Sequence, residues 1–232
     1  MTAILTTIGF DADDTLWQNE QFFRSAQERF ASLLADYDAP DHLSDRLLAA
    51  EKRNLGRYGF GIKGFVLSMI ETAIEVTDDQ VPASVIRELI AVGQDMLQHP
   101  VELLPHAREC IEHLAETHRI LLITKGDLLD QERKLAQSGL GDLFDGVEIV
   151  SAKVPQVYAD IFARHGVGPE TAMMVGNSMR SDILPVLSIG GWGVFVPHHP
   201  SWALEHVAPP VGHERFCEIG HLGLLGDLVA GL

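Results

Sequence analysis

The fold of this chain is decided by residues 4–16, which read ILTTIGFDADDTL. The first seven residues are apolar and β-prone, which predicts a buried parallel strand. Asp11, Asp13 and Asp14 follow at once, and a strand interior cannot bury such a cluster unpaired. We therefore expect these carboxylates just beyond the carboxyl end of the strand, where open α/β sheets bind ligands. A divalent cation such as Mg²⁺, which takes oxygen ligands, would relieve their mutual repulsion.

The spacing of the first two carboxylates indicates a catalytic role for both. Asp11 and Asp13 stand two residues apart, so a bend after Asp11 can aim both side chains at one pocket. One could attack as a nucleophile while the other handles protons. A structural role is the alternative, because Asp14 or Thr15 could cap the helix that follows.

The composition is that of a folded, acidic protein. The chain has 232 residues, 46% of them hydrophobic, which is enough for one large domain or two smaller ones. Its formal net charge of −16 argues against nucleic acid and anionic membranes as partners. A small anionic ligand stays compatible, because local positive charge can override the global field.

Several features indicate the cytoplasm as the expected compartment. Cys110 and Cys217 lie far apart in the sequence, so we expect no disulfide scaffold. No apolar run is long enough to span a bilayer. The N-terminus lacks the basic and apolar regions of a signal peptide.

Hydrophobic periodicity divides the chain into two kinds of structure. The stretch 17–100 predicts helices only, at about 17–39, 44–55, 65–75 and 82–97. After Pro105, predicted helices alternate with strands at about 119–124, 147–150, 171–175 and 193–196. A last small strand and a closing helix are expected within 211–232. This alternation predicts a parallel sheet with right-handed crossovers.

The first strand belongs with the later strands, so the helical stretch is an insertion. We expect an α/β fold with a Rossmann-like core, residues 1–16 and 100–232, and an all-helical cap domain, residues 17–99. An insertion that leaves the sheet beside the carboxylates is well placed to act as a lid.

Three later strand ends carry polar groups. Thr124 and Lys125 end one strand, Lys153 follows the next, and Gly176-Asn177 ends a third with Asp182 five residues beyond. At these places the hydroxyl and the lysine could bind an anion, and the additional carboxylate could complete the ligands of a metal ion. Each also has a structural explanation, as a helix cap, a solvated lysine or an acid at a helix N-terminus.

Taken in order, these residues resemble the motifs of the haloacid dehalogenase superfamily of hydrolases. Asp11 to Thr15 is similar to the first motif, D-x-D-x-T, although glycine is commoner where Asp14 stands. Thr124 matches the second motif and Lys153 the third. Gly176 to Asp182 has the G-D-x-x-x-x-D spacing of the fourth. The helical insertion is similar to the family's cap between the first two motifs.

The resemblance implies a role for each residue. Asp11 would be the nucleophile that takes a phosphoryl group, and Asp13 would protonate the leaving alcohol and then activate water. Thr124 and Lys153 would hold the phosphoryl oxygens. Mg²⁺ would be bound by Asp11, Asp182 and the backbone carbonyl of Asp13.

Two positions depart from the family pattern. Asn177 stands where aspartate is usual, which removes one negative charge from the metal site and predicts weaker Mg²⁺ binding. Lys125 follows the second motif where asparagine is usual, and it could contact the phosphate or face solvent.

The presence of Asp13 favours a phosphatase that acts on a small phosphorylated metabolite. The dehalogenases of the superfamily lack an acid there, since halide leaves without a proton, whereas an alkoxide needs one. A phosphotransferase or mutase is an alternative within the family. A degenerate phosphate- or metal-binding regulatory module is an alternative from another class.

The cap offers a local basic cluster in this acidic chain. Arg53, Arg57 and Lys63 surround the glycine-rich turn at 56–64, and they could read the non-reacting part of an anionic substrate. A solvated helix end explains them equally well. The identity of the substrate and the oligomeric state are not predicted.

Overall fold

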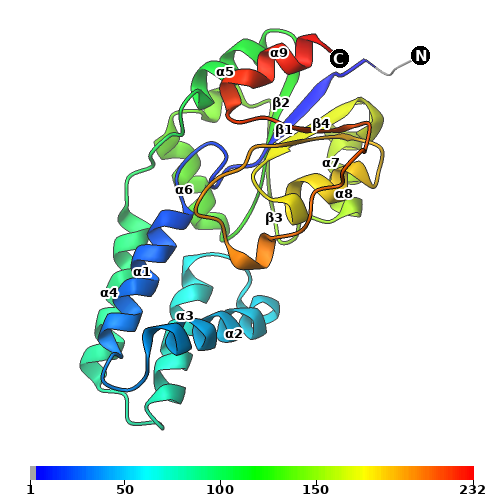
Figure 1. Ribbon diagram of the computed structural model, residues 1–232. Helices are drawn as coiled ribbons and strands as arrows, with labels where there is room; N and C mark the ends of the chain where they lie inside the picture. Colours follow the sequence, from blue (N-terminus) through cyan, green and yellow to red (C-terminus); the bar gives the residue numbers. More distant parts are fainter. Residues whose placement is uncertain (1–3) are drawn as a thin grey trace. The chain divides into compact units, whose positions relative to one another are not determined.

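The computed structural model describes residues 4–232. Over this range six parallel strands form one sheet in the order β3-β2-β1-β4-β5-β6. Figure 1 labels β1, β2, β3 and β4 of this sheet. Their bounds are β1 Thr7–Phe10, β2 Arg119–Lys125, β3 Gly146–Val150, β4 Ala172–Gly176, β5 Trp192–Phe195 and β6 Phe216–Glu218. The predicted fold class, an α/β fold with a parallel sheet and an inserted helical segment, is confirmed.

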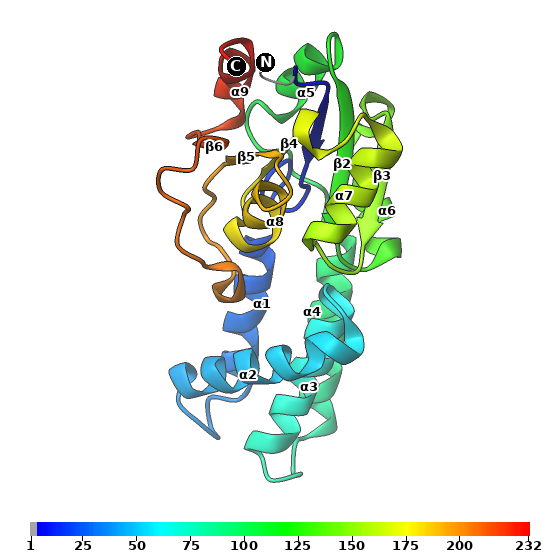
Figure 2. The same cartoon turned by 90° about the vertical axis from the view of Figure 1, so that its right-hand side faces the viewer.

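Helices cover both faces of this sheet (Figure 2). One face packs against α5 (Ala107–Ala115) and α9 (Leu225–Ala230), and the other against α7 (Pro155–His165) and α8 (Leu184–Leu187). Alternation along β2 explains the two layers, because Ile120 and Leu122 face the first core while Leu121 and Ile123 face the second. Both faces are thus apolar, as a parallel sheet requires.

The chain divides into two compact units. One holds the described residues up to Glu20, together with Val101–Lys125 and Gln131–Leu232. The other holds Gln21–Pro100 and Gly126–Asp130. Residues 1–3 of the predicted core lie outside the described residues.

The second unit is built on four helices, α1 (Glu20–Leu33), α2 (Pro40–Tyr58), α3 (Ile62–Val76) and α4 (Ala83–Gln98). Its core is apolar and includes Phe30, Leu47, Phe65, Met69 and Leu89. The helix predicted at 44–55 begins earlier, at Pro40, because proline at the first helical position already has the required φ. Within residues 4–232, no helix is both long enough and apolar enough to cross a lipid bilayer.

The helix that the alternation predicts between the strands at 171–175 and 193–196 has an unusual start. A π-helical turn, Met179–Ile183, comes first and leads into the short helix α8. The Ser178 side chain accepts a hydrogen bond from the main-chain nitrogen of Ser181 at 2.9 Å, which caps the turn. Asp182 therefore lies inside this turn and is 1% exposed.

Candidate active site

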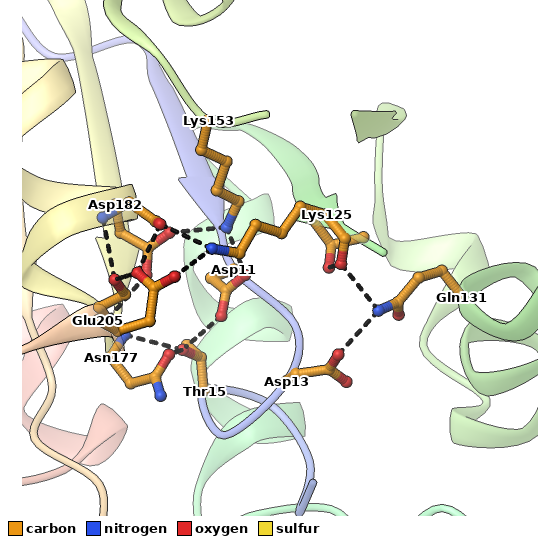
Figure 3. Close-up of polar contacts among 12 residues, drawn as sticks. Asp11, Asp13, Thr15, Lys125, Gln131, Lys153, Asn177, Asp182 and Glu205 are labelled. Atoms are coloured by element: carbon orange, nitrogen blue, oxygen red, sulfur yellow. Dashed lines mark hydrogen bonds and ion pairs between the residues drawn. The ribbon is translucent and has the colours of Figure 1, made fainter. Parts of the chain in front are cut away.

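The candidate catalytic residues follow the carboxyl ends of neighbouring strands. In the sheet register, Phe10 of β1 lies beside Leu122 of β2 and Val175 of β4. Asp11, Thr124 and Asn177 therefore reach the same edge of the sheet, and Lys153 follows β3 beside it. Figure 3 shows the side chains of Asp11, Lys153, Asn177 and Asp182 gathered at this edge.

The centre of the site is a buried lysine between two carboxylates. The Lys153 ammonium donates to Oδ1 of Asp11 and, at 2.7 Å, to Oδ1 of Asp182. The Lys153 side chain is only 2% exposed. Burial raises the pKa of Asp11 to about 7, although Lys153 opposes this shift. Burial would lower the pKa of Lys153, but the two carboxylates raise it above its ordinary value.

Local structure fixes the position of Asp182. Its Oδ2 accepts from the main-chain nitrogen of Ser178 at 2.9 Å, and its own nitrogen donates to the Ser178 carbonyl at 2.8 Å. A Cβ atom at Gly176 would lie 2.3 Å from Asp182 Oδ2. Glycine is therefore required at position 176, because any side chain would displace this carboxylate.

The side-chain amide of Asn177 faces two oxygen atoms that could be ligands of a metal ion. One terminal atom of its amide lies 3.2 Å from Asp11 Oδ2 and 3.3 Å from the main-chain oxygen of Asp13. Nitrogen in this place would donate to both atoms, whereas oxygen would make a cluster of three facing oxygens. Such a cluster needs a cation, and Mg²⁺ takes oxygen ligands of these kinds.

The carboxylates alone do not make a metal site. Among residues 4–232, no three His, Cys, Asp or Glu side chains are grouped so that they could hold an ion. Amide and main-chain oxygens would therefore have to complete the ligand set. Mg²⁺ fits this arrangement because it uses one or two carboxylates and keeps several waters.

The side chain of Asp13 points away from this cluster and contacts Gln131 (Figure 3). Its carboxylate accepts from Trp17 Nε1 at 2.8 Å, from Gln131 Nε2 at 2.8 Å and from the Lys134 ammonium at 2.9 Å. Burial disfavours the charge, but Lys134 and the hydrogen bonds lower the pKa of Asp13 below its ordinary value. The candidate acid–base residue is therefore ionised and fixed in this structure.

Gln131 and Lys134 were missed by the sequence analysis. They stand three residues apart on α6 (Leu128–Ser138) and so share one face of that helix. Both are buried, with 3% and 8% exposed. The sequence does show two long polar side chains at helical spacing after the second motif. This spacing indicates a shared helix face, but it does not identify Asp13 as the partner.

Thr124 and Lys125 end β2 beside this cluster. Thr124 is 1% exposed, and its hydroxyl lies 3.5 Å from the Lys125 carbonyl oxygen. The Lys125 ammonium pairs with the carboxylate of Glu205 and donates to Ser181 Oγ at 2.8 Å. Glu205 is a site neighbour that no motif identified, because it comes from an irregular segment far along the chain.

The structure explains the aspartate at position 14. This residue has φ of 60°, in the left-handed region that favours glycine. Its carboxylate accepts from the main-chain nitrogens of Asn19, at 2.8 Å, and Glu20, at 3.0 Å, where α1 begins. The helix-capping alternative thus describes Asp14. The hydrogen bonds of this cap offset the free-energy cost of the left-handed backbone conformation.

Replacement of Asp14 by alanine should lower the free energy of unfolding by about 2 kcal/mol. The loss of the cap costs about 1 kcal/mol, and a Cβ without a local hydrogen bond in the left-handed region costs about 1 kcal/mol more. Urea unfolding would measure it, with Asp14→Asn as the matched control, since asparagine tolerates this φ and keeps an acceptor. A loss in Asp14→Ala no larger than in Asp14→Asn would contradict this account.

The basic residues expected to read the substrate lie in the helical unit. Arg53 pairs with Glu75 at 2.8 Å, and Lys63 pairs with Asp127 at 3.0 Å. Arg57 is exposed. Two of the three thus have acidic partners within the protein, and their role in substrate recognition stays a prediction.

Known proteins resemble this chain along most of its length. A family model described as a haloacid dehalogenase-like hydrolase matches residues 5–190. A haloacid dehalogenase-like family hydrolase from Xanthomonas campestris is 39% identical, with a TM-score of 0.87, over 99% of this chain and 96% of that one.

Two further proteins differ in their chemistry. The glyceraldehyde 3-phosphate phosphatase of Methanothermobacter thermautotrophicus is 26% identical over 83% of this chain and 86% of its own length. A 2-haloacid dehalogenase from Pseudomonas syringae is 18% identical, with a TM-score of 0.65, over 98% of this chain and 99% of that one. The second likeness shows the fold alone.

Proposed function

Because this chain belongs to the haloacid dehalogenase-like hydrolase family, as its motifs predicted, we propose that it is a Mg²⁺-dependent phosphatase. Its substrate would be a small phosphate monoester. One observation carries this choice: a second carboxylate, Asp13, follows the candidate nucleophile Asp11 two residues later and is bound by three donors. An alkoxide leaving group needs a proton donor and a halide does not. The phosphatase among the curated relatives supports the same choice.

The proposed reaction has two steps. Asp13, which is ionised in the structure, first turns away from Lys134 and takes up a proton from solvent. An oxygen of Asp11 then attacks the phosphorus atom, the bond from phosphorus to the ester oxygen breaks, and the protonated Asp13 gives its proton to the leaving alkoxide. Asp13 then takes a proton from water, which attacks the aspartyl-phosphate and releases inorganic phosphate with Asp11 restored. Asp13 must turn from Trp17, Gln131 and Lys134 to do this, which needs only rotation of its side chain.

The remaining residues position the phosphoryl group. Thr124 would donate its hydroxyl, and Lys153 would exchange a carboxylate partner for a phosphoryl oxygen. Asp11, Asp182, Asn177 and the main-chain oxygen of Asp13 would hold Mg²⁺. When bound, Mg²⁺ supplies positive charge against the negative charge of the phosphoryl oxygens. Phosphoryl transfer depends chiefly on such positioning and charge neutralisation.

The helical unit would be the cap of this enzyme. Its residues Arg53, Arg57 and Lys63 would read the non-reacting part of the substrate. The predicted domain limits, 17–99 for the cap and 1–16 with 100–232 for the core, are part of this proposal.

The experiment is hydrolysis of an aryl phosphate and of glyceraldehyde 3-phosphate, each with Mg²⁺ and with a chelator. We expect phosphate release that requires Mg²⁺ and stops with the chelator. A 2-chloro carboxylic acid is the control substrate, from which no halide should be released. Halide release without phosphate ester hydrolysis would identify a dehalogenase instead.

A closed cap could exclude an artificial substrate, so a second measurement accompanies the first. Beryllium fluoride mimics a phosphoryl group on aspartate, and with Mg²⁺ it should raise the Tm of the wild-type protein. If there is neither hydrolysis nor a Tm shift, the proposed function is wrong and a binding module is favoured.

A further inference from the structure

A mostly buried ion pair lies beside the candidate active site, and none of the sequence motifs accounts for it. The side chains of Lys125 and Glu205 are 18% and 16% exposed. Lys125 ends β2, whereas Glu205 ends a single 3₁₀ turn, Ala203–Glu205, in the segment between β5 and β6. Ion pairs shielded in this way are screened by solvent much less than surface pairs.

The Glu205 carboxylate is fixed by more than the lysine. It accepts hydrogen bonds from the hydroxyls of Ser178 and, at 2.6 Å, Ser181. Lys125 in turn donates to Ser181 Oγ at 2.8 Å. Although burial opposes ionisation, Lys125 and the two hydroxyls hold the pKa of Glu205 below its ordinary value. The Glu205 carboxylate is thus ionised and held in a defined orientation beside the Lys125 ammonium.

These hydroxyls belong to the turn that presents Asp182. The main-chain nitrogen of Ser178 donates to Asp182 Oδ2 at 2.9 Å, and Ser181 immediately precedes Asp182. Arg180, in the same turn, donates to the carbonyl of Leu204 at 2.8 Å. Ser178, Arg180 and Ser181 of the fourth motif therefore all hydrogen-bond to the 3₁₀ turn.

We propose that Glu205 is a positioning residue. By forming an ion pair of zero net charge with Lys125, it sets the charge that this site presents to Mg²⁺ and to a phosphoryl group. This inference rests on the proposed function. It makes Lys125 a counterion of Glu205 and leaves Lys153 as the ammonium that meets the phosphoryl oxygens. The physical basis is electrostatic: a net positive charge at the pair would repel Mg²⁺ and attract a phosphoryl group, and a net negative charge would do the reverse.

The test measures two affinities in variants that change this charge in opposite directions. Isothermal titration calorimetry would give the affinity for Mg²⁺ alone and for inorganic phosphate at saturating Mg²⁺. Glu205→Gln leaves a net positive charge, so Mg²⁺ should bind about five- to tenfold more weakly and phosphate more tightly. Lys125→Met leaves a net negative charge, and both effects should reverse.

The double variant Glu205→Gln/Lys125→Met separates this role from a structural one. Because the charge is balanced again, both affinities should return to within about twofold of the wild-type values. Glu205→Asp, which keeps the charge, should stay close to the wild type. Glu214→Gln is the matched control, since this exposed glutamate lies in the same segment and should change neither affinity.

Two results would overturn the inference. One is a loss of both affinities in Glu205→Gln that the double variant does not restore, which would indicate a structural brace. The other is that every variant binds Mg²⁺ and inorganic phosphate as tightly as the wild type does. If the wild type still hydrolyses phosphate esters with Mg²⁺, the proposed function would stand without this inference. If Glu205→Gln does not fold, Glu205→Asp and Lys125→Met decide the question. A wild-type protein without Mg²⁺-dependent hydrolysis would overturn the proposed function itself, and this inference with it.

Discussion

Replacement of Asp11 by asparagine should lower the turnover of a phosphate ester by roughly a thousandfold or more. An amide is a far weaker nucleophile than a carboxylate, so the aspartyl-phosphate cannot form. The substitution nearly preserves the shape of the side chain, and Lys153 keeps its 2.7 Å contact with Asp182. The protein should therefore stay folded while the chemistry stops.

Phosphate release and the far-ultraviolet circular dichroism spectrum would be measured together for this variant. Asp142→Asn is the control, because Asp142 is an exposed aspartate in the same structural unit. Wild-type protein quenched in acid during turnover should carry a phosphoryl group on Asp11, and the variant should carry none. Near-normal turnover in Asp11→Asn would show that another group attacks the phosphorus atom.

The sequence predicted the sheet, and it placed the candidate site residues at strand ends, because both depend on local patterns. The alternation of apolar strands and amphipathic helices after Pro105 is sufficient for a parallel sheet. Strand ends then bring Asp11, Thr124, Lys153 and Asn177 together, since parallel strands share one edge for their carboxyl ends. No knowledge of distant contacts was needed for these residues.

Residues that act on the motifs through distant contacts could not be predicted. Gln131 and Lys134 reach Asp13 across more than 100 positions, and Glu205 reaches Lys125 across 80. Such partners depend on how the packed elements lie beside one another, and periodicity carries no information about this. The π-helical turn was missed for a related reason, because its geometry follows from the Ser178 cap and not from apolar spacing.

Replacement of Lys153 by methionine should lower the free energy of unfolding by about 3–5 kcal/mol at neutral pH without metal, and it should abolish turnover. Breaking a buried charge pair by removing one partner leaves an uncompensated charge. Here Asp11 and Asp182 would both lose their shared cation, and both are buried. The phosphoryl group would lose its ammonium ligand at the same time.

Urea unfolding with and without Mg²⁺ would measure this effect and also test the metal site. A divalent cation held by these carboxylates would replace the missing positive charge, so Mg²⁺ should stabilise Lys153→Met more than the wild type. The double variant Asp11→Asn/Lys153→Met should recover part of the lost stability, because a neutral amide replaces a carboxyl group whose charge burial disfavours. Lys52→Met, at an exposed lysine, is the control and should be close to the wild type. If Mg²⁺ stabilises Lys153→Met no more than the wild type, Asp11 and Asp182 do not hold the metal together, and the proposed ligand set is wrong.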